Sequence, residues 1–205
     1  AQAKIMEINA SIAGASLIPY RTTVSSRHLM NYAAAVNDNN PLYFDDRRKE
    51  GIMGHPMSCV AITWPILENL PEYLKGGSFP PQFLDTQVHY SEYLHFFRPL
   101  RPGDRLTING MITAVLPHKS GTVLFVRLKV SDASGQPVFT EIAGALLRGV
   151  QCTGQETVVE DLPAVPETPP HSGVLWEKRV LIDPLQTYLY DGCSNIHFPI
   201  HTSRT

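Results

Sequence analysis

The chain has 205 residues, of which 43% are hydrophobic and 18% charged, and its formal net charge is −2. This length predicts one or two domains, and this composition is typical of a globular protein. The small net charge gives no electrostatic reason to expect binding to nucleic acid or to an anionic membrane. No apolar run approaches the ~18 residues of a membrane span, and the start of the chain lacks the features of a signal peptide.

The first half of the chain predicts short helices joined by a polar turn. Residues 18–24 have the pattern of an extended segment, and "SSRHLMNYAAAV" is typical of a short helix with Ser25 or Ser26 as its N-cap. "NDNNPLYFDD" carries the Asn, Asp and Pro of a turn. In "MSCVAITWPILENL", apolar residues recur at helical spacing, and Pro65 is expected to kink the helix or end its first half.

Long strands dominate the middle of the chain. "TQVHYSEYLHFF", "RLTINGMITAVL" and "TVLFVRLKVSD" are β-rich runs, and "SDASGQ" predicts a hairpin turn into "PVFTEIAGALLRG". In the third run, alternate residues from Leu124 to Val130 are apolar, whereas Arg127 and Lys129 lie between them, as in a half-buried antiparallel strand. A helix followed by several antiparallel strands predicts an α+β fold in which a sheet wraps a helix.

The composition changes after the last of these strands. Residues 151–173 contain four prolines and no periodic pattern, which predicts a linker. We therefore predict a first domain over residues 1–150 and the start of a new unit over residues 174–205. Three cysteines, far apart and odd in number, predict neither a disulfide framework nor a zinc site, so we expect a reducing, cytoplasmic location.

The new unit resembles the beginning of the chain. "YDGCSNIHFPIH", which starts at Tyr190, aligns without a gap on "YAAAVNDNNPLY", which starts at Tyr32. In this alignment His201 takes the place of Tyr43. The pattern indicates an internal duplication. Further matches are Pro41 with Pro199 and Leu42 with Ile200.

Three blocks resemble the MaoC-like family of (R)-specific enoyl-CoA hydratases and 3-hydroxyacyl dehydratases. "YAAAVNDNNPLYFDDRRKEGIMGHPM" is similar to the family's helix, its Asp-x-Asn-Pro-x-His turn and its Gly-containing loop. "FRPLRPGDRLTINGMITAV" is similar to its turn-and-strand block, and "DASGQPVFTEIAGALLRG" to its closing hairpin. The resemblance implies a hot-dog fold, in which a curved antiparallel sheet wraps a long central helix. It also implies a double hot-dog chain whose second unit, from residue 174, is incomplete in this sequence.

In double hot-dog members, the first copy typically loses the catalytic pair and shapes the acyl pocket, while the second copy keeps the pair. The resemblance therefore makes His201 the proton-transfer residue, with Tyr43 in its place in the first copy. The family's acid lies five residues before the histidine, where this chain has Ile196. Asn195 is expected to position water, and Asp191 is the alternative acid. The sequence assigns no other substrate-binding residue.

The implied reaction is hydration of an enoyl thioester, or dehydration of a 3-hydroxyacyl thioester. It needs a base, an acid and a donor to the enolate-like oxygen, and histidine exchanges a proton near neutral pH. His197 and His201 also have the i, i+4 spacing of a metal pair. Pro199 between them opposes a regular helix and no third ligand is evident, so we expect no metal.

The resemblance thus predicts a lyase of fatty acid metabolism that acts on an acyl-CoA thioester, needs no cofactor and forms homo-oligomers such as dimers. One alternative is an acyl-CoA thioesterase, which would want a carboxylate on the central helix, where only Glu68 is available. Another is a non-catalytic subunit that binds acyl thioesters, which Tyr43 and Ile196 would permit.

Several residues of the first copy have a structural alternative to a functional role. Asp38 fits a turn cap as well as a catalytic acid. "EGIMGHPM" can offer a backbone N–H to a ligand or need glycine for a positive φ, and His55 is expected to set the shape of this loop. Arg47–Lys49 suits a CoA phosphate or a solvated turn, and Trp64 suits the core or a dimer contact better than a ligand cage.

Overall fold

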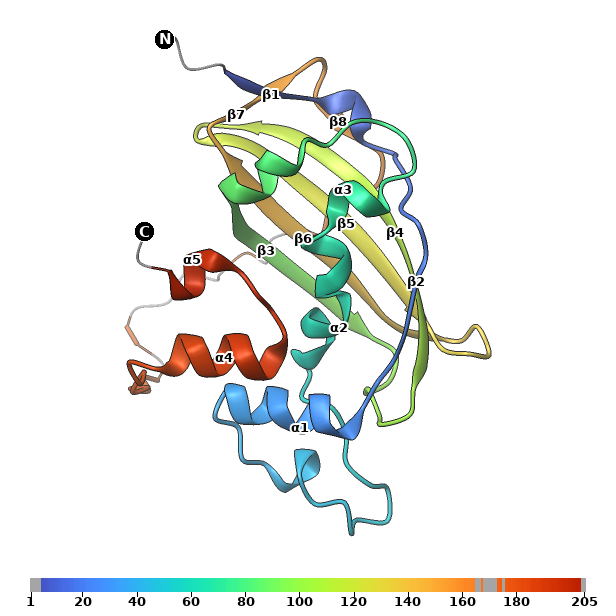
Figure 1. Ribbon diagram of the computed structural model, residues 1–205, viewed down its shortest axis with the longest axis vertical. Coiled ribbons are helices and arrows are strands. Elements are labelled where there is room, and N and C mark those ends of the chain that lie inside the picture. The colour runs from blue at the N-terminus through green and yellow to red at the C-terminus, as the bar shows by residue number, and fades with distance from the viewer. Residues whose placement is uncertain (1–4, 165–166, 168–172, 175, 204–205) are drawn as a thin grey trace.

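The computed structural model describes residues 5–164, 167, 173–174 and 176–203, and shows a curved sheet with a helix against its inner face (Figure 1). All strand pairs of the six-stranded sheet are antiparallel. A separate parallel pair joins β1 (Met6–Asn9) to β7 (Val150–Thr153). The main sheet has the order β2 (Tyr20–Thr23), β4 (Arg105–His118), β5 (Gly121–Ser131), β6 (Pro137–Arg148) and β3 (Gln87–Phe96), and β8 (Thr157–Val158) pairs with β4.

The central helix is α2 (Ser58–Leu67), and the short helix α3 (Leu70–Tyr73) follows it. Pro65 has no N–H to donate to the preceding turn, and α2 ends at Leu67, which gives a helix of 10 residues. The helix and the wrapped sheet confirm the α+β, hot-dog fold expected from the sequence. Among the described residues, no helix is long and apolar enough to cross a bilayer.

The core lies between α2 and the concave face of the sheet. In β5 the alternate residues from Leu124 to Val130 are buried, whereas Lys129 is exposed, as the alternation predicted. Burying a side chain of this size stabilises the fold by roughly 1.5–3 kcal/mol relative to leaving it exposed. From α2, the buried apolar side chains are Cys59, Ala61, Ile62 and Ile66.

The helix α1 (Ser26–Ala35) begins where the sequence predicted. Ser25 is its N-cap, and its Oγ accepts a hydrogen bond of 3.1 Å from the N–H of His28. Against α1 lies α4 (Gln186–Ser194), and α5 (Pro199–Thr202) follows it (Figure 1). A helical layer beside the wrapped sheet is therefore built from both ends of the chain.

The stretch predicted as a linker is partly structured. Its first residues belong to β7 and β8, which bind it to β1 and to β4. Backbone hydrogen bonding to a partner strand needs no periodic apolar pattern in so short a segment, so these strands could not be predicted from local sequence. Residues 165–166 and 168–172 of the predicted linker lie outside the described residues.

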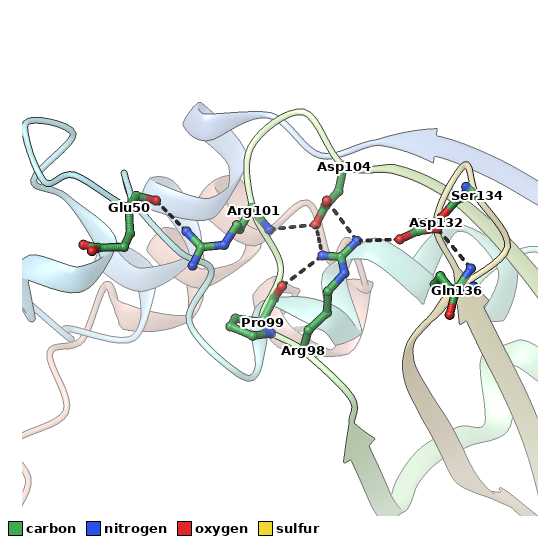
Figure 2. A network of polar contacts seen from close by, with 8 residues as sticks. All are labelled: Glu50, Arg98, Pro99, Arg101, Asp104, Asp132, Ser134 and Gln136. Atoms are coloured by element: carbon green, nitrogen blue, oxygen red, sulfur yellow. Dashed lines mark hydrogen bonds and ion pairs between the residues drawn. The ribbon is translucent and has the colours of Figure 1, made fainter.

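A network of charged side chains fixes the "FRPLRPGD" block (Figure 2). Arg98 donates from Nη1 and Nη2 to the two carboxylate oxygens of Asp104, at 2.8 and 3.1 Å. Its Nη2 also contacts Asp132 at 3.4 Å, and Asp132 accepts the N–H groups of Ser134 and Gln136. The Ser134 hydroxyl, the backbone donors and Arg98 lower the pKa of Asp132. The arginine of this motif therefore has a structural role, clamping the β3–β4 loop to the β5–β6 turn.

The edge strand β3 carries exposed aromatic residues, and uncovered strand edges favour pairing. Tyr90 and Tyr93 are each 49% exposed, and Phe97, directly after the strand, is 54% exposed. We expect this 205-residue chain to cover the edge with a second copy, and Tyr93→Lys to weaken that association through charge repulsion. Sedimentation velocity measures it, with Ile5→Lys, another exposed apolar residue, as the control. A wild-type chain that sediments as a stable monomer would contradict this prediction.

Candidate active site

A cavity of about 520 Å³ lies between α2, the strands β3 and β6, and the C-terminal segment. This volume is in the usual range for small-molecule sites. Most of its wall is apolar, which suits a hydrocarbon chain. Its apolar residues include Val60, Trp64 and Leu67 from α2 and Ile196, Phe198 and Ile200 from the C-terminal segment.

The histidine predicted to transfer a proton lines this cavity. His201 lies in α5, which Pro199 begins at its first turn. The ring centroid of Phe198 lies 6.1 Å from that of Trp64 on α2 and 6.0 Å from that of His201. Aromatic packing of the C-terminal segment on α2 thus holds the imidazole at the cavity wall. The His201 side chain remains exposed, so it can exchange protons with solvent.

The other two polar residues predicted near His201 are not among the described residues that line the cavity. Asn195 is exposed and ends α4 in the left-handed conformation, with φ 60° and ψ 25°. The carboxylate of Asp191 lies 3.2 Å from Nδ1 of His197, whose side chain is 63% exposed. The structure therefore brings His201 to the cavity but places Asn195 and Asp191 outside its wall.

The position of the family's usual acid is part of a small apolar cluster. Ile196 is 6% exposed and packs with Tyr32 and Ala61. Its backbone N–H donates to the hydroxyl of Ser194 at 3.2 Å. A carboxylate at this position would be buried among apolar groups, which costs free energy unless a partner is supplied.

The Gly-containing loop of the first copy uses its own backbone donors. The N–H of Gly54 donates to the carbonyl oxygen of Leu100 at 2.8 Å, and that of Met57 to Nδ1 of His55 at 3.1 Å. A Cβ on Gly54 would lie 2.9 Å from the side chain of Leu29, so this glycine is required by close packing. These contacts favour the structural interpretation of the loop, and His55 does set its shape.

The first turn is also held by local contacts. Asp38 accepts the N–H of Asn40 at 3.1 Å, which is the predicted turn cap, and lies 3.7 Å from Nε2 of His55. Burial lowers the pKa of His55, and the Asp38 charge opposes this. Arg47 folds back onto Asp45 at 2.9 Å, which favours a solvated turn over a phosphate contact.

Two carboxyl groups in the cavity were missed by the sequence reasoning. Glu92 on β3 and Glu141 on β6 line it, and Glu141 is 0% exposed. Burial raises the pKa of Glu92 to about 8; burial, with the Glu92 charge as a second cause, raises the pKa of Glu141. The available signal was a glutamate at an inward position of β6, between the buried residues Phe139 and Ala143.

Comparisons with known proteins agree with this architecture. Residues 11–141 match the family model described as FAS1-like, dehydratase domain region. A UPF0336 protein of Streptomyces coelicolor is 29% identical, over 66% of this chain and 91% of its own length. A MaoC-like dehydratase from Phytophthora capsici superimposes with a TM-score of 0.72 at 20% identity, covering 94% of this chain and 66% of that one. This chain thus spans about two thirds of that dehydratase.

A second solved structure gives a narrower match. The HadBC complex of Mycobacterium tuberculosis, a 3R-hydroxyacyl-ACP dehydratase, superimposes with a TM-score of 0.55 at 16% identity. It covers 66% of this chain and 96% of that one. At these identities both structures show the fold, and the Phytophthora match extends it into the C-terminal segment.

Proposed function

We propose that this chain, which belongs to the FAS1-like dehydratase-region family, contributes to a hydro-lyase that acts on an acyl-CoA thioester. The enzyme adds water to an enoyl thioester and removes it from a 3-hydroxyacyl thioester. One observation carries the proposal: His201 lines the apolar cavity. In the internal alignment this histidine corresponds to Tyr43 of the first copy. An apolar cavity accepts the acyl chain, and an imidazole at its wall can take a proton from water.

In this mechanism His201 takes a proton from water as the water oxygen bonds to Cβ. The electron pair of the double bond moves toward the thioester carbonyl oxygen, and the protonated His201 then gives its proton to Cα, which restores the neutral imidazole. Each positioned proton transfer contributes roughly 10²–10⁴-fold to the rate. The N–H groups of Gly54 and Met57 in the loop of the first hot dog are already engaged. The donor to the thioester carbonyl oxygen therefore comes from a second hot-dog unit.

We also propose that residues 174–205 begin a second hot dog, joined by residues 151–173 to the first, which spans residues 1–150. Backbone conformation supports the duplication. Asn37 has φ 59° and Asn195 has φ 60°, and they are the non-glycine residues with positive φ in the described part of the chain. Each lies four residues before the proline that begins a short helix, Pro41–Tyr43 in the first copy and Pro199–Thr202 in the second.

Contacts between α1 and α4 support the same proposal. The hydroxyls of the two aligned tyrosines, Tyr32 and Tyr190, lie 3.4 Å apart. At the same alignment, Gln186 corresponds to His28, and each of these side chains contacts the carbonyl end of the other helix. Reciprocal contacts of this kind are expected where two copies are related by a two-fold axis. The partners are Ser194 O for His28, at 3.2 Å, and Ala35 O for Gln186.

The structure does not favour a thioesterase. Glu68 is the C-cap of α2, and the described α2 residues that line the cavity carry no carboxylate. A non-catalytic subunit that binds acyl thioesters has one observation in its favour, the buried Ile196 at the position of the family's acid.

Steady-state assays of the full-length gene product test the proposal. With an enoyl-CoA substrate, we expect loss of enoyl absorbance without release of thiol. A thioesterase would release free CoA, detectable with a thiol reagent. A binding subunit would do neither, and either of those results would refute the hydro-lyase assignment.

Two substitutions decide whether Asn195 positions water. Its left-handed backbone suits glycine, whereas alanine there costs roughly 1 kcal/mol. Because Asn195 lies outside the cavity wall, we expect Asn195→Gly to keep hydration and stability, and Asn195→Ala to lower the Tm while keeping kcat. Equal losses of kcat in both variants, with the Tm of Asn195→Gly unchanged, would instead support the water-positioning role predicted from sequence.

A further inference from the structure

Three residues that line the cavity each have a buried polar atom without a hydrogen-bond partner among the described residues. These atoms are Nε1 of Trp64, Oε1 of Glu92 and Oε1 of Glu141. Leaving a buried donor or acceptor unpaired costs free energy. A ligand that carries a polar group can pair with them in this otherwise apolar site.

The contact with Thr63 engages one carboxyl oxygen of Glu141. The Thr63 Oγ1 atom donates to Oε2 of Glu141 at 2.7 Å and also lies 3.1 Å from the carbonyl oxygen of Val60. Burial raises the pKa of Glu141, and the hydrogen bond from Thr63 opposes this. The Oε1 atom of Glu141 has no partner among the described residues.

Glu92 lies beside Glu141 on the neighbouring strand. Glu92 pairs with Ala143 and Glu141 with Leu94, so the two glutamates are diagonal neighbours on one face of the sheet. Burial raises the pKa of Glu92 to about 8, so the Glu92 carboxyl is mostly protonated at neutral pH. The two carboxyls thus present both donors and acceptors without requiring two charges in an apolar cavity.

We propose that Trp64, Glu92 and Glu141 bind a hydroxyl group on the acyl chain, and that the substrates are acyl thioesters hydroxylated away from the thioester. This inference rests on the proposed function for the thioester part. His201 is exposed whereas Glu141 is 0% exposed, so the reacting end lies at His201 and the inner part of the chain meets the glutamates.

A hydroxyl fits this group of residues better than the alternatives. It donates to a carboxyl oxygen and accepts from Trp64 Nε1 or from a carboxyl proton. An ammonium group cannot accept a hydrogen bond, and its transfer into an apolar wall costs free energy before any pairing. A plain hydrocarbon leaves the three polar atoms unpaired, and sites built to bond a hydroxyl discriminate strongly against analogues that lack it.

Binding of unreactive probes to this chain tests the inference. Isothermal titration calorimetry compares the affinity of the chain for dodecanoyl-CoA with its affinity for hydroxydodecanoyl-CoA isomers, each with one hydroxyl at a different carbon of the distal half. We expect the best isomer to bind about 10-fold more tightly or better, which corresponds to ~1.4 kcal/mol. Glu141→Leu is expected to abolish or reverse this preference. Glu92→Gln, which still donates and accepts, should retain it, and Glu68→Gln is a control outside the cavity wall.

If Glu141→Leu does not fold, Trp64→Phe provides the second test, since it removes one donor and should reduce the ratio of hydroxylated-chain to plain-chain affinity. Equal binding of plain and hydroxylated chains to wild type would overturn the inference. Tighter binding of an ω-amino chain would also overturn it, because it indicates recognition of a cation. Loss of the preference in Glu92→Gln would overturn the role given to Glu92 as a neutral donor and acceptor.

The saturated probes do not react, so binding and catalysis are read separately. A hydroxyl preference without hydration activity would support the polar site and refute the hydro-lyase assignment. Hydration of plain enoyl-CoA without any hydroxyl preference would support the hydro-lyase assignment and refute the polar site.

Discussion

His201→Ala should lower kcat for hydration by about 10²-fold or more in the full-length gene product. The reason is that the variant loses the imidazole that takes the proton from water at the cavity wall. Because the side chain is exposed, its removal should leave the Tm nearly unchanged. Steady-state kinetics with an enoyl-CoA measure the effect, and thermal unfolding checks the fold.

The chain offers a matched control for this variant. His197 lies on the same segment, has a side chain that is 63% exposed, contacts Asp191 at 3.2 Å, and is not among the described residues that line the cavity. His197→Ala should hydrate at nearly the wild-type rate. If His201→Ala also did so, the active-site interpretation of this segment would fail. If Asp191→Asn were as damaging as His201→Ala, with folding intact, Asp191 would be the missing acid.

Stability should fall as the pH rises from about 5 to 8. Glutamates titrate near 4.5 in the unfolded chain, whereas burial raises the pKa of Glu92 to about 8 and also raises the pKa of Glu141. The folded state therefore binds more protons than the unfolded state in this window. The stabilisation that these carboxyls contribute is fully present below pH 4.5 and is lost as the pH approaches 8. The slope is at most about 1.4 kcal/mol per pH unit for each carboxyl.

Neighbouring titratable groups set the design of this experiment. Partial burial lowers the pKa of His89 in the same cavity, which gives the opposite slope below pH 6.5. Burial raises the pKa of the Cys59 thiol, which matters only at alkaline pH. The difference between wild type and the double variant Glu92→Gln, Glu141→Gln isolates the carboxyls. Unfolding free energies with the same pH dependence in both proteins would contradict the prediction, and Glu68→Gln should follow wild type.

Local patterns were sufficient to predict much of the fold. The Ser25 cap, the Asp38 turn and the alternation of β5 were all confirmed, because each depends on residues close together in sequence. The resemblance to MaoC-like dehydratases, drawn from three blocks, was confirmed by the family match over residues 11–141.

Features that depend on tertiary contacts could not be predicted in this way. Glu141 is in the core because β6 turns that face toward α2, where Thr63 meets it, and no local pattern specifies that partner. Asn195 was assigned as the polar neighbour of Ile196; it ends α4 in the left-handed conformation and is not among the described residues that line the cavity, and its role stays a prediction. The strand β8 forms because β4 offers it an edge.

Exchange of solvent deuterium tests the central claim most directly. The full-length protein is incubated in D₂O with a 3-hydroxyacyl-CoA, and mass spectrometry measures the deuterium content of the recovered thioester. Reversible loss and addition of water replaces a hydrogen at Cα, so wild type should place one deuterium there and His201→Ala should place almost none in the same time. A thioester that is hydrolysed, or recovered without deuterium at Cα after prolonged incubation with the wild-type protein, would contradict the account.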